Sequence, residues 1–384
     1  MAYVAVTGGQ EAIAATMTLL ADYRHQGNVA LDPVAIVNRM GLLIDKIMGE
    51  AGLYDPDHAA LALMQSEGSV EEAVFLLRAY RSSLMRTYYS LPLDGAQMRL
   101  LRRISAAYKD VPGGQMLGAT YDYTHRLLDF SLLCEQKETE IGSIASGEDG
   151  CVPLYAQRVS DLLRAENIIE RLPDPATQTE ALPEDITQNP LRFPTPRSAR
   201  LQAMARAESG YLGGLAYANL RGFGQAHPTV GELRTGWLEV DIEHPLLEGE
   251  VLHVGEIQLT EVESFFSLEE ESHLEELRDD PLRRMQSGQG DKADTSTNAL
   301  QIGIGYGLTF GRSDQKAIAM SIMDFSLEKK SENILCDDEF VLLHGDCLEM
   351  SGFISHLKLP HYVTFQSKLD RVRSTQRDSE VSHA

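Results

Sequence analysis

The spacing of hydrophobic residues predicts that the N-terminal region, residues 1–172, is mainly helical. Ser69 and Glu72 form a capping box, and Asp55 followed by Pro56 is a second helix start signal. Apolar residues recur at every third or fourth position in four stretches, at 32–48, 55–65, 69–81 and 157–172. We expect an amphipathic helix in each of them.

A proline-rich stretch at 173–197 separates this region from the rest of the chain. Six of the fifteen prolines lie between Pro173 and Pro196. Because proline has no backbone N–H and a fixed φ, the stretch cannot run as a helix or as a central strand. We expect it to be a linker or an extended docking arm.

The C-terminal region, residues 198–374, combines two kinds of pattern. Polar and apolar residues alternate at 236–242 and 250–265, which predicts strands. The stretch 313–329 predicts a helix with Ser313 at its N-cap. The whole chain is therefore predicted to have an α+β fold, with a mainly helical first half and a mixed second half.

Glycines in the second half of the chain predict a helix end, a close contact between elements and a turn. The stretch 197–224 reads as one helix that closes near Gly222, with Gly213-Gly214 placed for close approach by a neighbouring element. The glycine-rich stretch 302–311 resembles a strand or a tight loop; its spacing fits neither phosphate-loop motif, so we favour a turn. The polar residues 375–384 predict a disordered tail.

Composition narrows the function classes. The chain has 34 basic and 57 acidic residues, and its formal charge of −23 opposes binding to a nucleic-acid backbone. It has neither a long apolar run nor a basic segment followed by an apolar one at its start, so we expect a cytoplasmic protein. Four cysteines without CxxC spacing argue against a disulfide framework, a zinc ribbon or an iron–sulfur cluster held by this chain alone.

Three polar segments could carry binding chemistry. The segment 111–130 gathers glycines with Asp122, Arg126 and Asp129, which is typical of a binding loop that leads into a helix; a capped helix with solvated charges is the alternative. The other two hold Arg221, His227, Glu232 and Arg234 between glycines, and Glu256 and Glu261 on a predicted strand. Arginine forks fit phosphate oxygens, but a charged surface turn or the wet side of a sheet would have the same composition.

Two histidines near the C-terminus, His356 and His361, are either metal ligands or packing residues. Pro360 between them prevents a continuous helix, so a turn could bring both imidazoles to one ion. Zinc normally takes at least three protein ligands. The remaining ligands would have to come from elsewhere in this chain, where His344 and Cys347 are nearest in sequence, or from another chain.

Several long stretches resemble one family. They are ISAAYKDVPGGQMLGATYDYTHRLLDF, RSARLQAMARAESGYLGGLAYANLRGFGQAHPTVGELR, GEIQLTEVESF, GYGLTFGRSDQKAIAMSIMD and GFISHLKLPHYVTFQ. Their order and content are similar to the PhnI subunits of the bacterial carbon–phosphorus lyase core complex, over nearly the whole chain. The acidic stretch 267–298 and the tail correspond least.

The resemblance implies a subunit that works with G and H subunits and an ATPase-like L subunit to replace the purine of MgATP by methylphosphonate. It also implies a purine nucleosidase activity on ATP or GTP for the subunit alone. Implied partners are the G, H and J subunits, with K and L as ATPase-like subunits. The matching histidines, His356 and His361, would hold Zn²⁺ at the interface with the J subunit, and Mg²⁺ would accompany ATP.

Cleavage at C1′ of a nucleotide passes through an oxocarbenium-like state, so a carboxylate near the ribose and cations near the triphosphate are expected. The candidate catalytic carboxylates are Asp122, Glu208, Glu232 and Glu256, with Asp129 and Glu261 as further acids in the same motifs. The candidate substrate-binding residues are Arg126, Arg221, His227, Arg234, Arg312 and Lys316. The alternative is a non-catalytic scaffold subunit that docks the radical and transferase partners.

Overall fold

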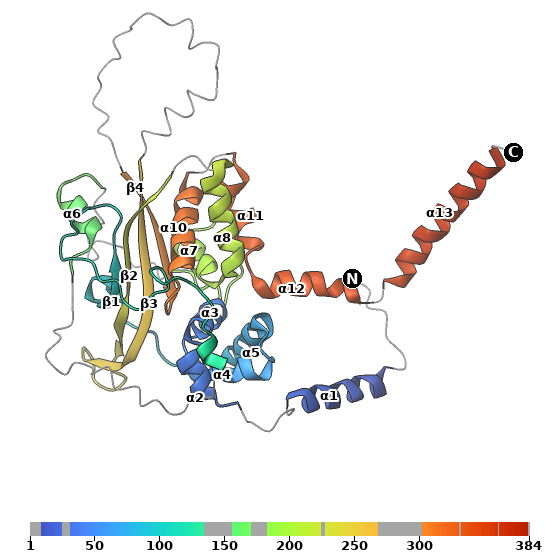
Figure 1. Ribbon diagram of the computed structural model, residues 1–384, viewed down its shortest axis with the longest axis horizontal. Helices are drawn as coiled ribbons and strands as arrows, with labels where there is room; N and C mark the ends of the chain where they lie inside the picture. The colour runs from blue at the N-terminus through green and yellow to red at the C-terminus, as the bar shows by residue number, and fades with distance from the viewer. Residues whose placement is uncertain are drawn as a thin grey trace, which may run out of the picture.

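The computed structural model describes residues 9–24, 31–133, 156–169, 183–223, 227–267, 302–329, 332–359 and 361–382. An antiparallel sheet forms the centre of the molecule, with helices against one of its faces and a bundle of N-terminal helices at one end (Figure 1). This arrangement confirms the α+β prediction. In the described part of the chain, no helix combines the length and the apolar content that a membrane span requires.

Three of the described N-terminal helices, the second, fourth and fifth, begin where the sequence predicted. The helices are α1 (Gln10–Arg24), α2 (Pro33–Arg39), α3 (Gly41–Ala51), α4 (Pro56–Gln65) and α5 (Val70–Ser83). Asp55 accepts a hydrogen bond from the His58 N–H at 3.0 Å, and Ser69 accepts one from the Glu72 N–H at 3.4 Å, so both predicted caps are present. The single helix predicted at 32–48 is instead α2 and α3, which are separated at Met40.

The sheet has the order β1-β2-β3-β4. Its strands are β1 (Arg99–Ile104), β2 (Thr229–Glu243), β3 (Val251–Ser267) and β4 (Ile302–Phe310). The strands predicted at 236–242 and 250–265 are confirmed as parts of β2 and β3. The sequence did not predict β1, which comes from the N-terminal region and pairs Arg103 with Arg234 of β2.

Helices α7 (Arg197–Arg206), α8 (Ser209–Ala218) and α10 (Asp314–Glu328) cover one face of the sheet (Figure 1). On this face the Ser264 hydroxyl lies 2.7 Å from the Ser321 hydroxyl of α10. A Cβ atom at Gly305 or Gly307 of β4 would collide with a backbone carbonyl oxygen of α10. The turn favoured for 302–311 is therefore wrong: this stretch is a strand, and its glycines let α10 approach closely.

The helix predicted at 197–224 is in fact two helices that meet at Ala207, the C-cap of α7. Gly222 has a φ of 112°, as expected for a closing glycine, and lies in the short η4 turn (Asn219–Phe223). Gly213 and Gly214 have no neighbouring atom within 4 Å of a built Cβ, so the close approach predicted there does not occur in the described structure. The predicted helix 157–172 is shorter as well, because α6 spans only Val159–Ala165.

Up to Leu133, where the described residues stop, the loop 111–130 leads into no α-helix. It ends at a short 3-10 turn, η2 (Phe130–Leu133). Another such turn, η1 (Gly95–Gln97), precedes β1. Of the proline-rich stretch, residues 183–197 are described, and Leu191 and Phe193 pack against the core between α7, α8 and α10.

The C-terminal elements are η6 (Ile334–Cys336), α11 (Asp338–Leu343), α12 (Cys347–Ser355), η7 (His356–Lys358) and α13 (Tyr362–Ser382). Helices α12 and α13 extend away from the body of the molecule (Figure 1). Helix α13 takes in most of residues 375–384, where the sequence predicted disorder. The stretch contains neither glycine nor proline, so nothing in it breaks the helix.

Candidate functional site

The face of the sheet opposite α10 carries a layer of charged side chains. Arg103 of β1 donates its Nε–H to Glu232 of β2, and both side chains are fully buried. Glu232 also accepts a hydrogen bond of 2.9 Å from the backbone N–H of Val159. The Arg103 guanidinium donates further to the carbonyl oxygens of Pro112 and Gly114. The candidate Glu232 of β2 therefore joins its own strand to β1 and to the start of α6.

Glu261 of β3 is the cross-strand partner of the candidate Arg234. Glu261 pairs with Arg158 at 2.9 Å, and its burial raises the pKa of its carboxyl group. Arg234 is 1% exposed and donates to the Ala156 carbonyl oxygen at 3.4 Å. Among the described residues, its Nε and Nη1 have no hydrogen-bond partner. The structure thus brings Glu232 and Arg234 together, but it encloses both.

The loop 111–130 is tied to the sheet and to α10 by Arg102. The Arg102 guanidinium donates to Asp122 at 2.6 Å and to Asp314 at 3.1 Å. A hydrogen bond from Thr120 and the charge of Arg102 lower the pKa of Asp122, which lies at the surface. The candidate Arg126 lies 3.7 Å from Asp122 and has a φ of 52°. Asp122 and Arg126 therefore form one exposed ionic group.

A second polar region lies where α3, α7, α8 and α10 meet. The candidate Glu208 caps α8 by accepting a hydrogen bond of 2.6 Å from the Tyr211 N–H, and it accepts another of 3.1 Å from Lys46. Burial raises the pKa of Glu208, but these donors outweigh burial and lower it overall. The candidate Lys316 donates to the Ala205 carbonyl oxygen at 2.7 Å, and burial lowers its pKa to about 8.

Two candidates lie in ion pairs elsewhere. Glu256 of β3 accepts a hydrogen bond of 2.7 Å from Arg99 of β1, and both side chains are partly exposed. Arg312 donates through both its backbone N–H and its Nε–H to Asp45, at 3.0 and 3.1 Å. These contacts hold the edge of the sheet and the start of α10 in place.

The remaining candidates are exposed. The guanidinium of Arg221 lies 5.8 Å from the ring centre of Tyr217, and His227 lies at the start of β2. Asp129 accepts hydrogen bonds from the backbone N–H and the hydroxyl of Ser131. The twelve or so sequence candidates are thus distributed over several places rather than gathered in one cleft.

The two histidines face one another at the junction of α12 and α13. The rings of His356 and His361 have their centres 5.6 Å apart. The Nδ1–H of His356 donates to the Phe353 carbonyl oxygen, and that of His361 donates to the Leu359 carbonyl oxygen at 2.6 Å. Because a carbonyl oxygen only accepts, the neutral form of each ring carries its proton on Nδ1 and has Nε2 as its acceptor, the arrangement typical of metal-ligating histidines.

The described residues place no third candidate metal ligand beside these two histidines. No group of three or more histidine, cysteine or acidic side chains in the described part of the chain is placed to hold a metal. His344, considered as a further ligand, instead donates its Nδ1–H to the Phe340 carbonyl oxygen at 2.8 Å. Cys347 is buried. Two imidazoles are fewer ligands than a tetrahedral zinc site takes, so a metal bound here would need further ligands from outside these residues.

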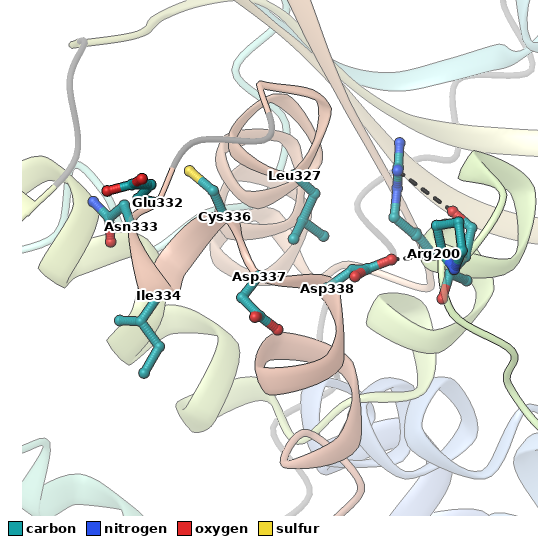
Figure 2. Close-up of a pocket in the computed structure, with 10 residues that line it drawn as sticks. Arg200, Leu327, Glu332, Asn333, Ile334, Cys336, Asp337 and Asp338 are labelled. Atoms are coloured by element: carbon teal, nitrogen blue, oxygen red, sulfur yellow. Dashed lines mark hydrogen bonds between the residues drawn. The ribbon is translucent and has the colours of Figure 1, made fainter.

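A cavity of about 510 Å³ lies between the end of α10 and α11 (Figure 2). Its lining includes Thr195, Arg200, Cys336 and Asp338, and Asp338 accepts a hydrogen bond of 2.9 Å from the Thr195 N–H. None of the residues selected from the sequence lines this cavity.

The sequence patterns missed a group of three arginines on α5 and α7. Arg78 and Arg81 lie one turn apart on α5, and Arg206 is the last residue of α7. The spacing of Arg78 and Arg81 is visible in the sequence, but no pattern indicates that Arg206 lies beside them.

Comparison with known proteins defines the class to which this structure belongs. Residues 2–379 match the model of a family described as bacterial phosphonate metabolism protein (PhnI). The chain therefore belongs to the PhnI family, as the resemblance noted in the sequence predicted.

Three relatives are similar over almost their full lengths. The alpha-D-ribose 1-methylphosphonate 5-triphosphate synthase subunit PhnI of Rhizobium meliloti (strain 1021) is 43% identical, with 100% of this chain and 97% of the relative covered. The protein of the same name from Escherichia coli (strain K12) is 40% identical, with 98% and 99% covered. The putative C-P lyase subunit protein HtxH of Stutzerimonas stutzeri is 41% identical, with 98% and 96% covered.

Proposed function

We propose that this chain is a subunit of a carbon–phosphorus lyase machinery for phosphonate catabolism. With G and H subunits and an ATPase-like L subunit, it replaces the purine of MgATP by methylphosphonate and forms α-D-ribose 1-methylphosphonate 5-triphosphate. Alone, it hydrolyses the same N-glycosidic bond of ATP or GTP. The observation that carries the proposal is the match to the PhnI family over residues 2–379, together with the names of relatives at 40% and 43% identity.

The chemistry requires three things of the protein's own groups. One must stabilise positive charge at C1′, one must hydrogen-bond the departing purine, and cations must hold the triphosphate with Mg²⁺. Asp122, Glu208 and Glu256 remain the better placed of the catalytic candidates, because none of them is fully buried. Glu232 is enclosed with Arg103, which supports a structural role.

We further propose that His356 and His361 hold a zinc ion shared with the J subunit. The supporting geometry is the pair of facing rings whose Nδ1–H groups are already engaged by backbone carbonyls. The exposed apolar residues on the same arm, Phe353, Ile354 and Leu357, support burial of this arm against a partner.

The second candidate function is a non-catalytic scaffold. The observation that favours it is that every catalytic candidate accepts a hydrogen bond from a basic side chain of the chain itself, as Glu256 does from Arg99 and Glu208 from Lys46. Under this alternative the chemistry takes place on the partners, and the chain supplies only docking surfaces.

Purine release distinguishes the two functions. The full-length chain is incubated with MgATP, both alone and after co-expression with G and H subunits, and free adenine is separated from nucleotides by chromatography. The proposed function predicts adenine and ribose 5-triphosphate in the absence of phosphonate. Absence of adenine in every combination, while the chain still assembles with its partners, would support the scaffold.

A further inference from the structure

Three arginine side chains converge at the C-terminal end of α3. Arg78 donates to the carbonyl oxygens of Glu50 and Arg206, and Arg81 donates to the carbonyl oxygen of Gly52. A Cβ atom built on Gly52 would lie 2.7 Å from Nη1 of Arg81 and 3.5 Å from Nε of Arg206. The guanidinium groups of Arg81 and Arg206 therefore flank a single point on the backbone.

The positive charge of this group exceeds the negative charge around it. Arg78 has a carboxylate partner, Asp346, at 2.5 Å. Neither Arg81 nor Arg206 has an ion-pair partner among the described residues, and the nearby Asp185 is taken by Arg86. In a chain with a net charge of −23, two unneutralised guanidinium groups side by side are not an effect of a generally basic surface.

Arg206 is the member with most hydrogen-bonding capacity left. In the described structure none of its side-chain nitrogens has a hydrogen-bond partner, and its Nε is buried. Burial first, and then the charges of Arg78 and Arg81, lower its pKa to about 10. Arg206 is half-buried, and a cation partly removed from water is normally paired, so this side chain fits an anion that it does not find within the described protein.

The group adjoins candidates for the proposed reaction. The carbonyl oxygen of Glu50 accepts from Arg78, while its carboxylate accepts a hydrogen bond of 2.8 Å from the Ser209 hydroxyl. Lys46 lies 3.8 Å from the same carboxylate and donates to Glu208. The arginines thus lie at the edge of the polar region that contains Glu208.

We propose that Arg81 and Arg206, positioned by Arg78, form a binding site for an oligophosphate, the triphosphate group of the nucleotide substrate. This inference rests on the proposed function and names the residues that would hold its substrate's charge. Paired guanidinium forks match phosphate oxygens, and a ligand with several negative charges balances the two unneutralised arginines. Recognition of a phosphate chain, rather than of a base, would also leave the site tolerant of both ATP and GTP.

The test uses the full-length chain in complex with the partner subunits that co-purify with it. Binding of inorganic tripolyphosphate is measured by calorimetry over a range of salt concentrations for the wild type, Arg81→Gln, Arg206→Gln and Arg206→Lys. Arg373→Gln is the matched control, because it removes the same charge from the exposed arm helix α13. Melting temperatures without phosphate report on folding.

We expect a tenfold or larger rise in the Kd of tripolyphosphate for each glutamine variant, a smaller rise for Arg206→Lys, and no change for Arg373→Gln. Each glutamine variant should also reduce the slope of log Kd against log salt by about one. Arg206→Gln should melt at or above the wild-type temperature, because it removes like-charge repulsion and no hydrogen bond. Absence of tripolyphosphate binding to the wild type, or equal Kd values for all variants, would overturn the site.

Purine release separates this inference from the proposed function. Tripolyphosphate binding that depends on Arg81 and Arg206 without any purine release would keep the site and reject the enzyme. Purine release with an unchanged KM for MgATP in Arg206→Gln would keep the enzyme and reject the site. An acidic peptide that binds with the same dependence, while tripolyphosphate does not, would assign the arginines to a protein partner and overturn the proposal.

Discussion

The imidazole rings of His356 and His361 face one another across the turn between α12 and α13, with ring centres 5.6 Å apart and an angle of 62° between their planes. Each ring donates its Nδ1–H to a backbone carbonyl oxygen, so the neutral form of each ring has its Nε2 lone pair for another partner. The two rings are therefore available as the metal ligands that we propose, and the described residues supply no third ligand beside them.

We therefore predict that His356→Ala and His361→Ala each remove zinc from the assembled complex. Carbon–phosphorus bond cleavage should be lost, whereas purine release, which does not use this arm, should persist. The metal content of the purified complex is measured by mass spectrometry. His344→Ala is the control, because the ring of His344 donates within its own helical turn and should not affect zinc. Full zinc occupancy in both arm variants would assign the two histidines to packing.

Buried and exposed carboxylates should respond differently to neutralisation. Glu232→Gln removes the charge that compensates the fully buried Arg103, and we expect it to lower the free energy of unfolding by about 3 to 5 kcal/mol. Glu256→Gln breaks a partly exposed pair with Arg99 and should cost less than about 1 kcal/mol. Denaturant titration of both variants measures the difference. Equal losses would contradict the assignment of Glu232 to a structural role.

The stability of the fold should depend on pH through Lys316. Burial lowers its pKa from 10.5 to about 8, so between these values the unfolded chain binds more protons than the folded one and stability rises with pH. The effect is on the order of 3 kcal/mol. Relative to Lys316→Met, the wild type should gain stability as pH rises through this window.

Lys46 provides the matched control for that experiment. Burial works against its charged form, but Glu50 and Glu208 outweigh burial and raise its pKa above 10.5. Its contribution is present below that value and is lost as pH rises further. Between about pH 8 and 10.5 the wild type should therefore gain stability relative to Lys316→Met but keep a constant difference from Lys46→Met. Curves for Lys316→Met that stay parallel to the wild type at every pH would show that burial does not lower the pKa of Lys316.

Glycines in β4 and in α8 should differ sharply in tolerance. Gly305→Ala would place its Cβ against the Ser321 carbonyl oxygen of α10, and we expect a loss of about 3 kcal/mol or more. Gly213→Ala meets no atom within 4 Å and should gain up to about 1 kcal/mol from helix propensity. Thermal unfolding of the two variants measures this contrast. A tolerated Gly305→Ala would mean that α10 does not pack closely on the sheet.

Local signals in the sequence predicted local structure well. The caps at Asp55 and Ser69 and the alternation in β2 and β3 depend only on neighbouring residues, and all are present. Strand β1 was not predicted because its sequence, RLLRRI, places Arg102 and Arg103 next to each other and breaks the alternation. Both arginines are buried only because distant carboxylates, Asp314 and Glu232, pair with them.

Contacts between residues far apart in the sequence also limited what could be predicted for the glycines and for the site. A sequence shows where a glycine is, but not whether a helix lies over it, so Gly213 was assigned the close approach that Gly305 makes. The histidine pair was found because both ligands lie in one turn. Arg81 and Arg206 were not grouped, because only the packing of α7 beside α5 brings them together.

The formation of the proposed product tests the central claim most directly. The chain, assembled with its G, H and L subunits, is given MgATP and methylphosphonate, and the products are identified by phosphorus NMR and chromatography of the purine. The account predicts free adenine together with a ribose that carries a methylphosphonate at C1 and an intact 5-triphosphate. Release of ADP and inorganic phosphate without free adenine would contradict it, because the bond broken would then be a phosphoanhydride and not the N-glycosidic bond.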